Sequence, residues 1–150
     1  EGAPRLLNSN TSIIPCRPLN SNRIVLETWP AQLAKLFSGK YKNEGREGHS
    51  PNLKKARIRI IEGISSCEMA ENLGFPVKIE KGLISLLIND GKGDSLDSIL
   101  CSVQAGWAWR QSNLSYGIPK ENNKIIALEG WITGYGSDPK ITQRSKVFPL

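Results

Sequence analysis

The sequence predicts an α/β fold with a helix-rich C-terminal part, and three observations support that prediction. A short apolar run with β-branched members at residues 23–27 is typical of a buried strand. Pro30 follows at the position of a first helical residue, directly before an apolar stripe. Longer apolar patterns of helical spacing recur at residues 51–64 and 94–107. A chain of 150 residues has the usual size of one domain built around one core.

The N-terminal third alternates between irregular and regular segments. Residues 1–22 are rich in asparagine, serine and proline, and their apolar residues show neither the two-residue period of a strand nor the 3.6-residue period of a helix. We therefore expect an irregular leader or covering loop. The strand at 23–27 should be central in its sheet, because it is apolar on both faces. Residues 40–49 combine charge and glycine without an apolar period, which predicts an exposed, mobile loop. The helix at 51–64 then begins with a serine N-cap and a proline.

Two short elements should follow this helix. Ser65 and Glu68 form a capping-box pattern for a short helix that Gly74 would close. The apolar cluster at 83–88 fits either a strand or a buried helix, and we prefer the helix.

The C-terminal half should be organised around one long helix. This helix begins at Asp94, and Gly106 within it would permit close packing against a neighbour. The apolar segment 124–133 predicts a short strand or a clamp packed on the helices. Residues 136–150 are weakly patterned and form a tail.

Charge is the first indication of function. The chain carries 20 basic and 14 acidic residues, a net charge of +6, which favours nucleic acid or another polyanion as partner. Eight basic residues but only two acidic ones lie between residues 35 and 59, so this region holds the whole excess. The eight are Lys35, Lys40, Lys42, Arg46, Lys54, Lys55, Arg57 and Arg59. A solvated surface without a partner is the alternative that the charge leaves open.

Cysteine usage and hydropathy indicate the cellular compartment of the chain. The three cysteines are widely spaced and lack a C-x-x-C pair, which disfavours zinc and favours a reducing, cytoplasmic compartment. No apolar run is long enough to span a membrane, and the first residues lack a secretory pattern. His49, the only histidine, lies in the basic loop and is expected to be solvated. The four tryptophans, Trp29, Trp107, Trp109 and Trp131, could stack on bases, but their spacing favours the core.

Three acidic residues are the candidates for chemistry. Glu27 follows the predicted strand, at the edge where ligands gather in open α/β sheets. Asp94 and Asp97 begin the long helix, where capping and the helix dipole already explain both. If all three met beside the basic loop, they would suit Mg²⁺ or Mn²⁺ and metal-assisted phosphodiester hydrolysis. Spacing alone leaves both interpretations open.

Four segments, taken in order, resemble a known family. They read LETWPA at 26–31, KNEGR at 42–46, GDSLDSILC at 93–101 and LEGWI at 128–132. Together they are similar to a widespread family of unknown function whose members are predicted RNase H-like nucleases. The resemblance covers about residues 23–135 and implies an RNase H-like partial domain there.

The resemblance also implies roles for individual residues. Glu27 would end the fourth strand of the fold, and Asp97 or Asp94 on the last core helix would complete a metal site. The basic side chains of Lys42, Arg46 and Arg57 would face a nucleic-acid backbone. Ser98 replaces the family's usual alanine. The family's first strands, with the central aspartate ligand, have no counterpart before Glu27, so the chain resembles a truncated member.

Three hypotheses follow for the function. The first is a magnesium- or manganese-dependent nuclease domain acting on DNA or RNA, incomplete or inactive as this chain alone. The second is a binding module that holds a polyanion without chemistry. The third is a structural fragment that a partner, or a second copy of the chain, completes.

Overall fold

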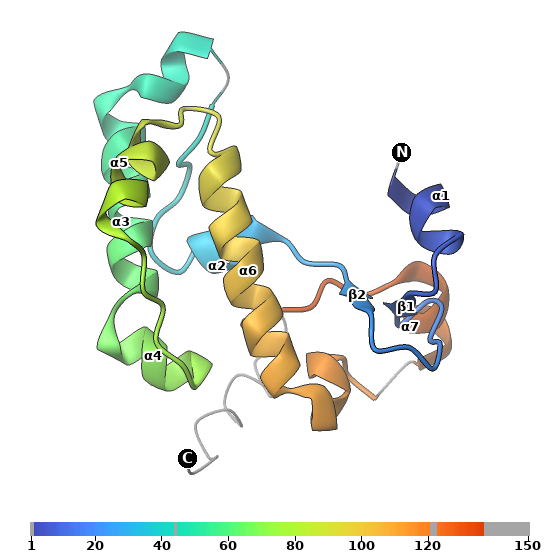
Figure 1. Cartoon of the computed structure of the whole chain (residues 1–150). Coiled ribbons are helices and arrows are strands. Elements are labelled where there is room, and N and C mark those ends of the chain that lie inside the picture. The colour runs from blue at the N-terminus through green and yellow to red at the C-terminus, as the bar shows by residue number, and fades with distance from the viewer. Residues whose placement is uncertain (1, 44, 121–122, 137–150) are drawn as a thin grey trace.

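The computed structural model describes residues 2–43, 45–120 and 123–136, and it shows a mixed α/β fold that is rich in helices. Figure 1 shows the long helix α6 crossing the middle of the molecule, with α3, α4 and α5 on one side and the small sheet on the other. The elements in chain order are α1 (Gly2–Leu7), β1 (Ser12–Ile14), β2 (Ile24–Leu26), α2 (Pro30–Ala34), the 3₁₀ helix η1 (Gly45–His49), α3 (Pro51–Ile64), α4 (Cys67–Leu73), α5 (Lys81–Asn89), α6 (Asp94–Arg110), the 3₁₀ helix η2 (Ser112–Gly117) and α7 (Asn123–Glu129).

The sheet has two parallel strands, and one of them lies where no regular structure was predicted. β1 pairs with β2 in a register that sets Ser12 opposite Ile24 and Ile14 opposite Leu26. The prediction that residues 1–22 are irregular is therefore wrong for β1 and for α1. Three strand residues are too few to display a period, so the sequence pattern could not reveal β1.

The strand β2 was predicted correctly, but its surroundings differ from the expectation. Its residues are half-buried, whereas a strand covered on both faces was expected. Beyond the end of β2, Glu27 forms a parallel bridge with Ile132, and Thr133 N–H donates to the Glu27 carbonyl over 2.8 Å. The segment after α7 is thus joined by one isolated bridge to the residue that follows β2.

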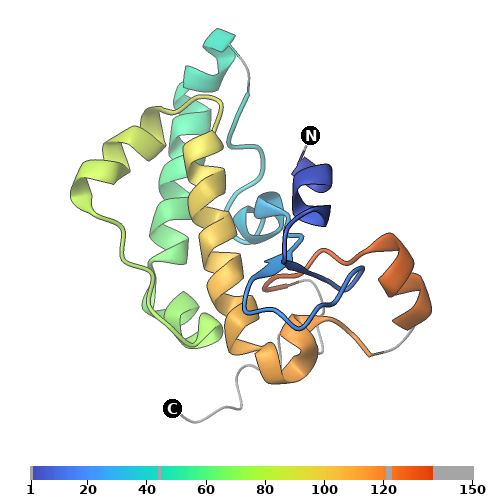
Figure 2. The same cartoon turned by 45° about the vertical axis from the view of Figure 1, so that its right-hand side comes forward.

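The helices enclose the core as their apolar patterns predict. On α3, Ile60, Ile61 and Ile64 are buried, and on α6 the Trp107 side chain is fully buried. α6 packs against α2, while α3 packs against α5. Figure 2 shows α6 between α2 on one side and α3 and α5 on the other. Gly106 lies so close to Phe75 that a Cβ there would be 2.9 Å from its ring, which confirms the close approach predicted for this glycine.

The shorter elements confirm some expectations and correct others. The apolar cluster at 83–88 is helical, within α5. The cap of α4 is Ser66, whose Oγ accepts from Met69 N–H, so the capping box predicted from Ser65 and Glu68 is wrong: the cap lies one residue later, and the N3 position holds a methionine. Gly74 ends α4 with a φ of 80°, as predicted for a C-terminal glycine.

The segment 124–133 also differs from the expectation. Most of it forms the helix α7, with Leu128 84% exposed, and only its end reaches the sheet. Apart from Gly136, the tail predicted at 136–150 lies outside the described residues.

Candidate functional site

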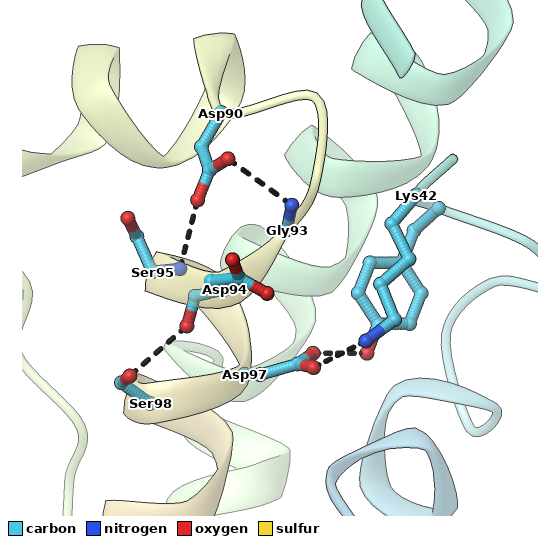
Figure 3. Close-up of polar contacts among 8 residues, drawn as sticks. Lys42, Asp90, Gly93, Asp94, Ser95, Asp97 and Ser98 are labelled. Atoms are coloured by element: carbon cyan, nitrogen blue, oxygen red, sulfur yellow. Dashed lines mark hydrogen bonds and ion pairs between the residues drawn. The ribbon is translucent and has the colours of Figure 1, made fainter. Parts of the chain in front are cut away.

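The four segments that resemble the nuclease family (26–31, 42–46, 93–101 and 128–132) are called the resemblance segments below. Residues from two of them meet at the start of α6. Lys42 forms an ion pair with Asp97, and the hydroxyl of Tyr41 donates to the other oxygen of the same carboxylate. Figure 3 shows the Lys42 and Asp97 side chains pointing toward each other. Gly93 makes this approach feasible, because a Cβ there would lie 2.9 Å from Lys42 Cβ. Both oxygens of Asp97 are therefore engaged by the chain itself.

The pair lies at the rim of the core. The Lys42 side chain is 40% exposed and the Asp97 side chain 19% exposed, so water screens their attraction only in part. Burial raises the pKa of Tyr41 well above its usual range, and the hydrogen bond to Asp97 raises it further. Tyr41 is therefore a neutral donor to Asp97 at ordinary pH.

The carboxylate that caps α6 is Asp90. Its two oxygens accept from Gly93 N–H over 3.2 Å and from Ser95 N–H over 2.8 Å, as Figure 3 shows. Gly93 is the N-cap residue, so the expectation that Asp94 caps this helix is wrong. The Asp94 side chain is exposed, and only its backbone carbonyl is bonded, by Ser98 Oγ at 2.9 Å.

Removal of this cap should lower the stability of the fold. We expect Asp90→Ala to reduce the free energy of unfolding by about 1 to 2 kcal/mol, because Ser95 N–H loses its acceptor and Gly93 N–H keeps only the backbone carbonyl of residue 90. Asp94→Ala is the matched control and should stay within about 0.5 kcal/mol of wild type. Urea unfolding measures both, and an equal loss in the two variants would contradict the assignment of the cap.

The same contact predicts a pH dependence. The backbone N–H groups of Ser95 and Gly93 hold the pKa of Asp90 below its usual value. A depressed pKa stabilises the fold above the unfolded-state pKa, near 4, and that contribution is lost as the pH falls through the folded-state pKa. The stability difference between wild type and Asp90→Ala should therefore shrink in acid.

Glu27 contacts the last resemblance segment rather than joining a cluster of acids. Its side chain is exposed, and a Cβ on Gly130 would lie 3.6 Å from Glu27 Oε2. The bridge to Ile132 described above holds the backbone of Glu27 against the same segment. The four segments thus meet in two pairs: 42–46 with 93–101, and 26–31 with 128–132.

The acids do not fit a metal ion in this arrangement. Within the described part of the chain, no three histidine, cysteine, aspartate or glutamate side chains are gathered closely enough to hold one. Hard cations take several oxygen ligands, and the carboxylate of Asp97 is already shared between a cation and a hydroxyl. The expected meeting of Glu27, Asp94 and Asp97 is not present.

Arg57 is an internal anchor, which corrects its expected place at a phosphate-binding surface. Its side chain is fully buried, and each of its three nitrogen atoms donates to a backbone carbonyl. The acceptors are Ile88 at 2.8 Å, Tyr41 at 2.7 Å and Gly48 at 3.0 Å. The signal was present in the sequence, because residue 57 shares the helical stripe of Ile60, Ile61 and Ile64.

The other basic residues of the 35–59 region lie at the surface. Four are exposed, namely Lys35, Lys40, Lys55 and Arg59, and Lys42 and Lys54 are half-exposed. Among the described residues the only ion pair is that of Lys42 with Asp97, so the four exposed cations have no acidic partner there. Arg46 belongs to η1, but its side chain lies outside what the structure describes. We call Lys40, Lys55 and Arg59 the basic trio.

The tryptophans divide between core and surface. Trp107 is fully buried, as predicted, whereas Trp29 is 46% and Trp109 66% exposed, contrary to the expected core positions. The Lys35 ammonium lies 4.2 Å from the centre of the Trp29 ring. Trp109 has no ring partner among the described residues, so its indole is available for a ligand.

Comparison with known proteins gave no match: no protein family, no curated protein and no solved structure matches this chain. In the described part of the structure, no helix combines the length and the apolar character that crossing a membrane requires.

Proposed function

We propose that this chain is a nucleic-acid-binding domain of RNase H-like character. It holds the phosphate backbone through its basic trio and does not cleave nucleic acid by itself. The observation that carries the proposal is the exposed basic trio, Lys40, Lys55 and Arg59, with no acidic partner in the described residues. Cations without partners gain most from phosphate, because they release its condensed counterions without first breaking an ion pair.

The spatial pairing of the resemblance segments supports the RNase H-like part of the proposal. Lys42 and Asp97 are 55 residues apart in the chain and come from different segments, yet they form an ion pair. Glu27 and Ile132 come from the other two segments and form an isolated β-bridge. Segments that recur together in a family are expected to meet in its fold.

The arrangement of the acids supports binding without cleavage. Metal-assisted hydrolysis needs carboxylates that converge on the same ions. Here the carboxylate of Asp97 is neutralised by Lys42, while the Asp94 and Glu27 side chains are exposed to water. Lys42 therefore serves as the internal counter-ion of Asp97.

The direct test is fluorescence anisotropy with labelled 20-nucleotide DNA and RNA, single- and double-stranded, in EDTA and in Mn²⁺. We expect dissociation constants of about 10⁻⁴ to 10⁻⁶ M near physiological salt, typical of backbone binding, with intact oligonucleotide on a denaturing gel afterwards. The absence of binding at 50 mM salt would contradict the proposal.

Metal-dependent phosphodiester hydrolysis is a second candidate, and the half-buried carboxylate of Asp97, a hard oxygen ligand at the rim of the core, favours it. A metal ion could use this carboxylate only if Lys42 released it. Under this candidate, Lys42→Gln should bind Mn²⁺ more tightly than wild type in a magnetic-resonance titration. Any oligonucleotide cleavage should also be abolished by Glu27→Gln and by Asp97→Asn. Unchanged Mn²⁺ binding in Lys42→Gln would exclude a role for Asp97 as a ligand.

A further inference from the structure

A cavity of about 440 Å³ lies between β2 and the C-terminal half of α6, away from the Lys42–Asp97 pair. Its lining is uncharged and largely apolar, with Ile24, Val25 and Leu26 on one side and Trp109 and Tyr116 on the other. The size suits a small ligand or one unit of a polymer. This lining offers no counter-charge to an ion, so the part of a ligand that enters the cavity should be neutral.

Gln104 lines this cavity and carries a side-chain donor without a partner among the described residues. The side chain is fully buried, and its Oε1 accepts from Tyr135 N–H over 2.7 Å. This bond identifies the other amide atom, Nε2, as the one without a partner. Gly134 packs directly on the amide, since a Cβ there would lie 2.5 Å from Oε1. The amide is thus held in one orientation, with its donor free.

Thr28 also lines the cavity and carries a second unpaired group. Its Oγ1 is buried and has no hydrogen-bond partner in the described part of the chain. Buried polar groups are nearly always paired, and each unpaired one destabilises the fold. Two such groups on residues that line one cavity therefore indicate a ligand that satisfies both.

Trp109 defines the shape of that ligand. Its indole is 66% exposed and lines the same cavity. An exposed ring beside an uncharged pocket offers a stacking surface for a flat, neutral ring. The Gln104 donor requires an acceptor on the edge of that ring, and the Thr28 hydroxyl can pair with either a donor or an acceptor there.

We propose that this cavity binds a nucleobase, which stacks on Trp109 and pairs along its edge with Gln104 and Thr28. A nucleobase is planar and uncharged, and it carries adjacent donors and acceptors, while its sugar and phosphate remain outside in water. This inference deepens the proposed function, and it rests on that function for one point only, the source of the base. That source is a single strand with an unpaired base, or a free nucleoside.

The test is a titration of the ¹⁵N-labelled protein with uridine, cytidine, guanosine and adenosine, each to 10 mM, with ribose as the control ligand. We expect the side-chain amide signal of Gln104 to shift with nucleosides and not with ribose. Thr28→Val should weaken binding about fivefold, the loss of one hydrogen bond, and Trp109→Ala about tenfold or more. Trp29→Ala, an exposed tryptophan outside the cavity lining, should leave the affinity unchanged.

Two results would overturn the inference: no shift of the Gln104 amide with any nucleoside, or nucleoside affinity that is the same in Thr28→Val, Trp109→Ala and wild type. Thr28→Val removes a buried hydroxyl without a partner, so its melting temperature should equal or exceed that of wild type, which separates weakened binding from unfolding.

Oligonucleotides separate the pocket from the basic surface. Neutralisation of the basic trio should weaken oligonucleotide binding and leave nucleoside binding intact. Binding of nucleosides without oligonucleotides would support the pocket and contradict the proposed function. Binding of oligonucleotides without any response at Gln104 would contradict the pocket alone.

Discussion

Replacement of Arg57 by methionine is expected to lower the free energy of unfolding by at least about 3 kcal/mol, because three backbone carbonyls, two of them in buried hydrogen bonds, lose their donor at once. Arg57 joins three parts of the chain through these carbonyls: the segment at Tyr41, the end of η1 at Gly48 and α5 at Ile88. Methionine fills much of the same volume but donates no hydrogen bond. A loss of this size is a large share of a domain's stability.

Arg59→Met is the matched control, two residues further along the same helix. The Arg59 side chain is exposed, so its replacement should change the free energy of unfolding by no more than about 0.5 kcal/mol. Urea unfolding of both variants compares them directly. Equal stability of Arg57→Met and wild type would show that the buried guanidinium is not an anchor.

Neutralisation of the basic trio should produce the largest change in nucleic-acid binding. We expect Lys40→Gln, Lys55→Gln and Arg59→Gln together to weaken binding of a single-stranded 20-nucleotide DNA by about a hundredfold at 50 mM salt, because three counterion-releasing contacts are lost. All three side chains are exposed, so the fold should be retained. Circular dichroism and urea unfolding check the fold, and anisotropy measures the affinity.

A control with the same loss of charge separates local contacts from the overall field. Lys78, Lys81 and Lys120 are exposed and lie outside the 35–59 region. Their combined replacement by glutamine also removes three positive charges, yet it should weaken binding only a few-fold. Equal losses in the two triple variants would show that net charge, and not the basic trio, determines the affinity.

Helical periodicity predicted most of the fold. The stripes of α3 and α6 each run for several turns, so the burial of Ile60 and Trp107 follows from spacing alone. The strand β1 escaped prediction because three residues carry no period. The cap of α6 was misplaced because Asp90 reaches forward over a turn to Ser95, whereas Asp94 occupied the expected position in sequence.

The candidate site was less predictable, because it depends on contacts between distant segments. The family resemblance placed Arg57 at a nucleic-acid-binding surface, although its spacing with Ile60 and Ile64 put it on the buried face of α3. The ion pair of Lys42 with Asp97 joins residues 55 positions apart, and no local pattern indicates such a pairing. The unpaired groups of Thr28 and Gln104 are likewise visible only in three dimensions.

The most direct test of the account is the salt dependence of single-stranded DNA binding by wild type and by the variant with a neutralised basic trio. Single-stranded contacts contribute a slope of about −0.7 each to a plot of log K against log salt concentration. The account predicts that the slope of the variant is shallower by about 2, while the control variant with Lys78, Lys81 and Lys120 replaced keeps the wild-type slope. An unchanged slope in the basic-trio variant would contradict the assignment of these residues to the phosphate backbone.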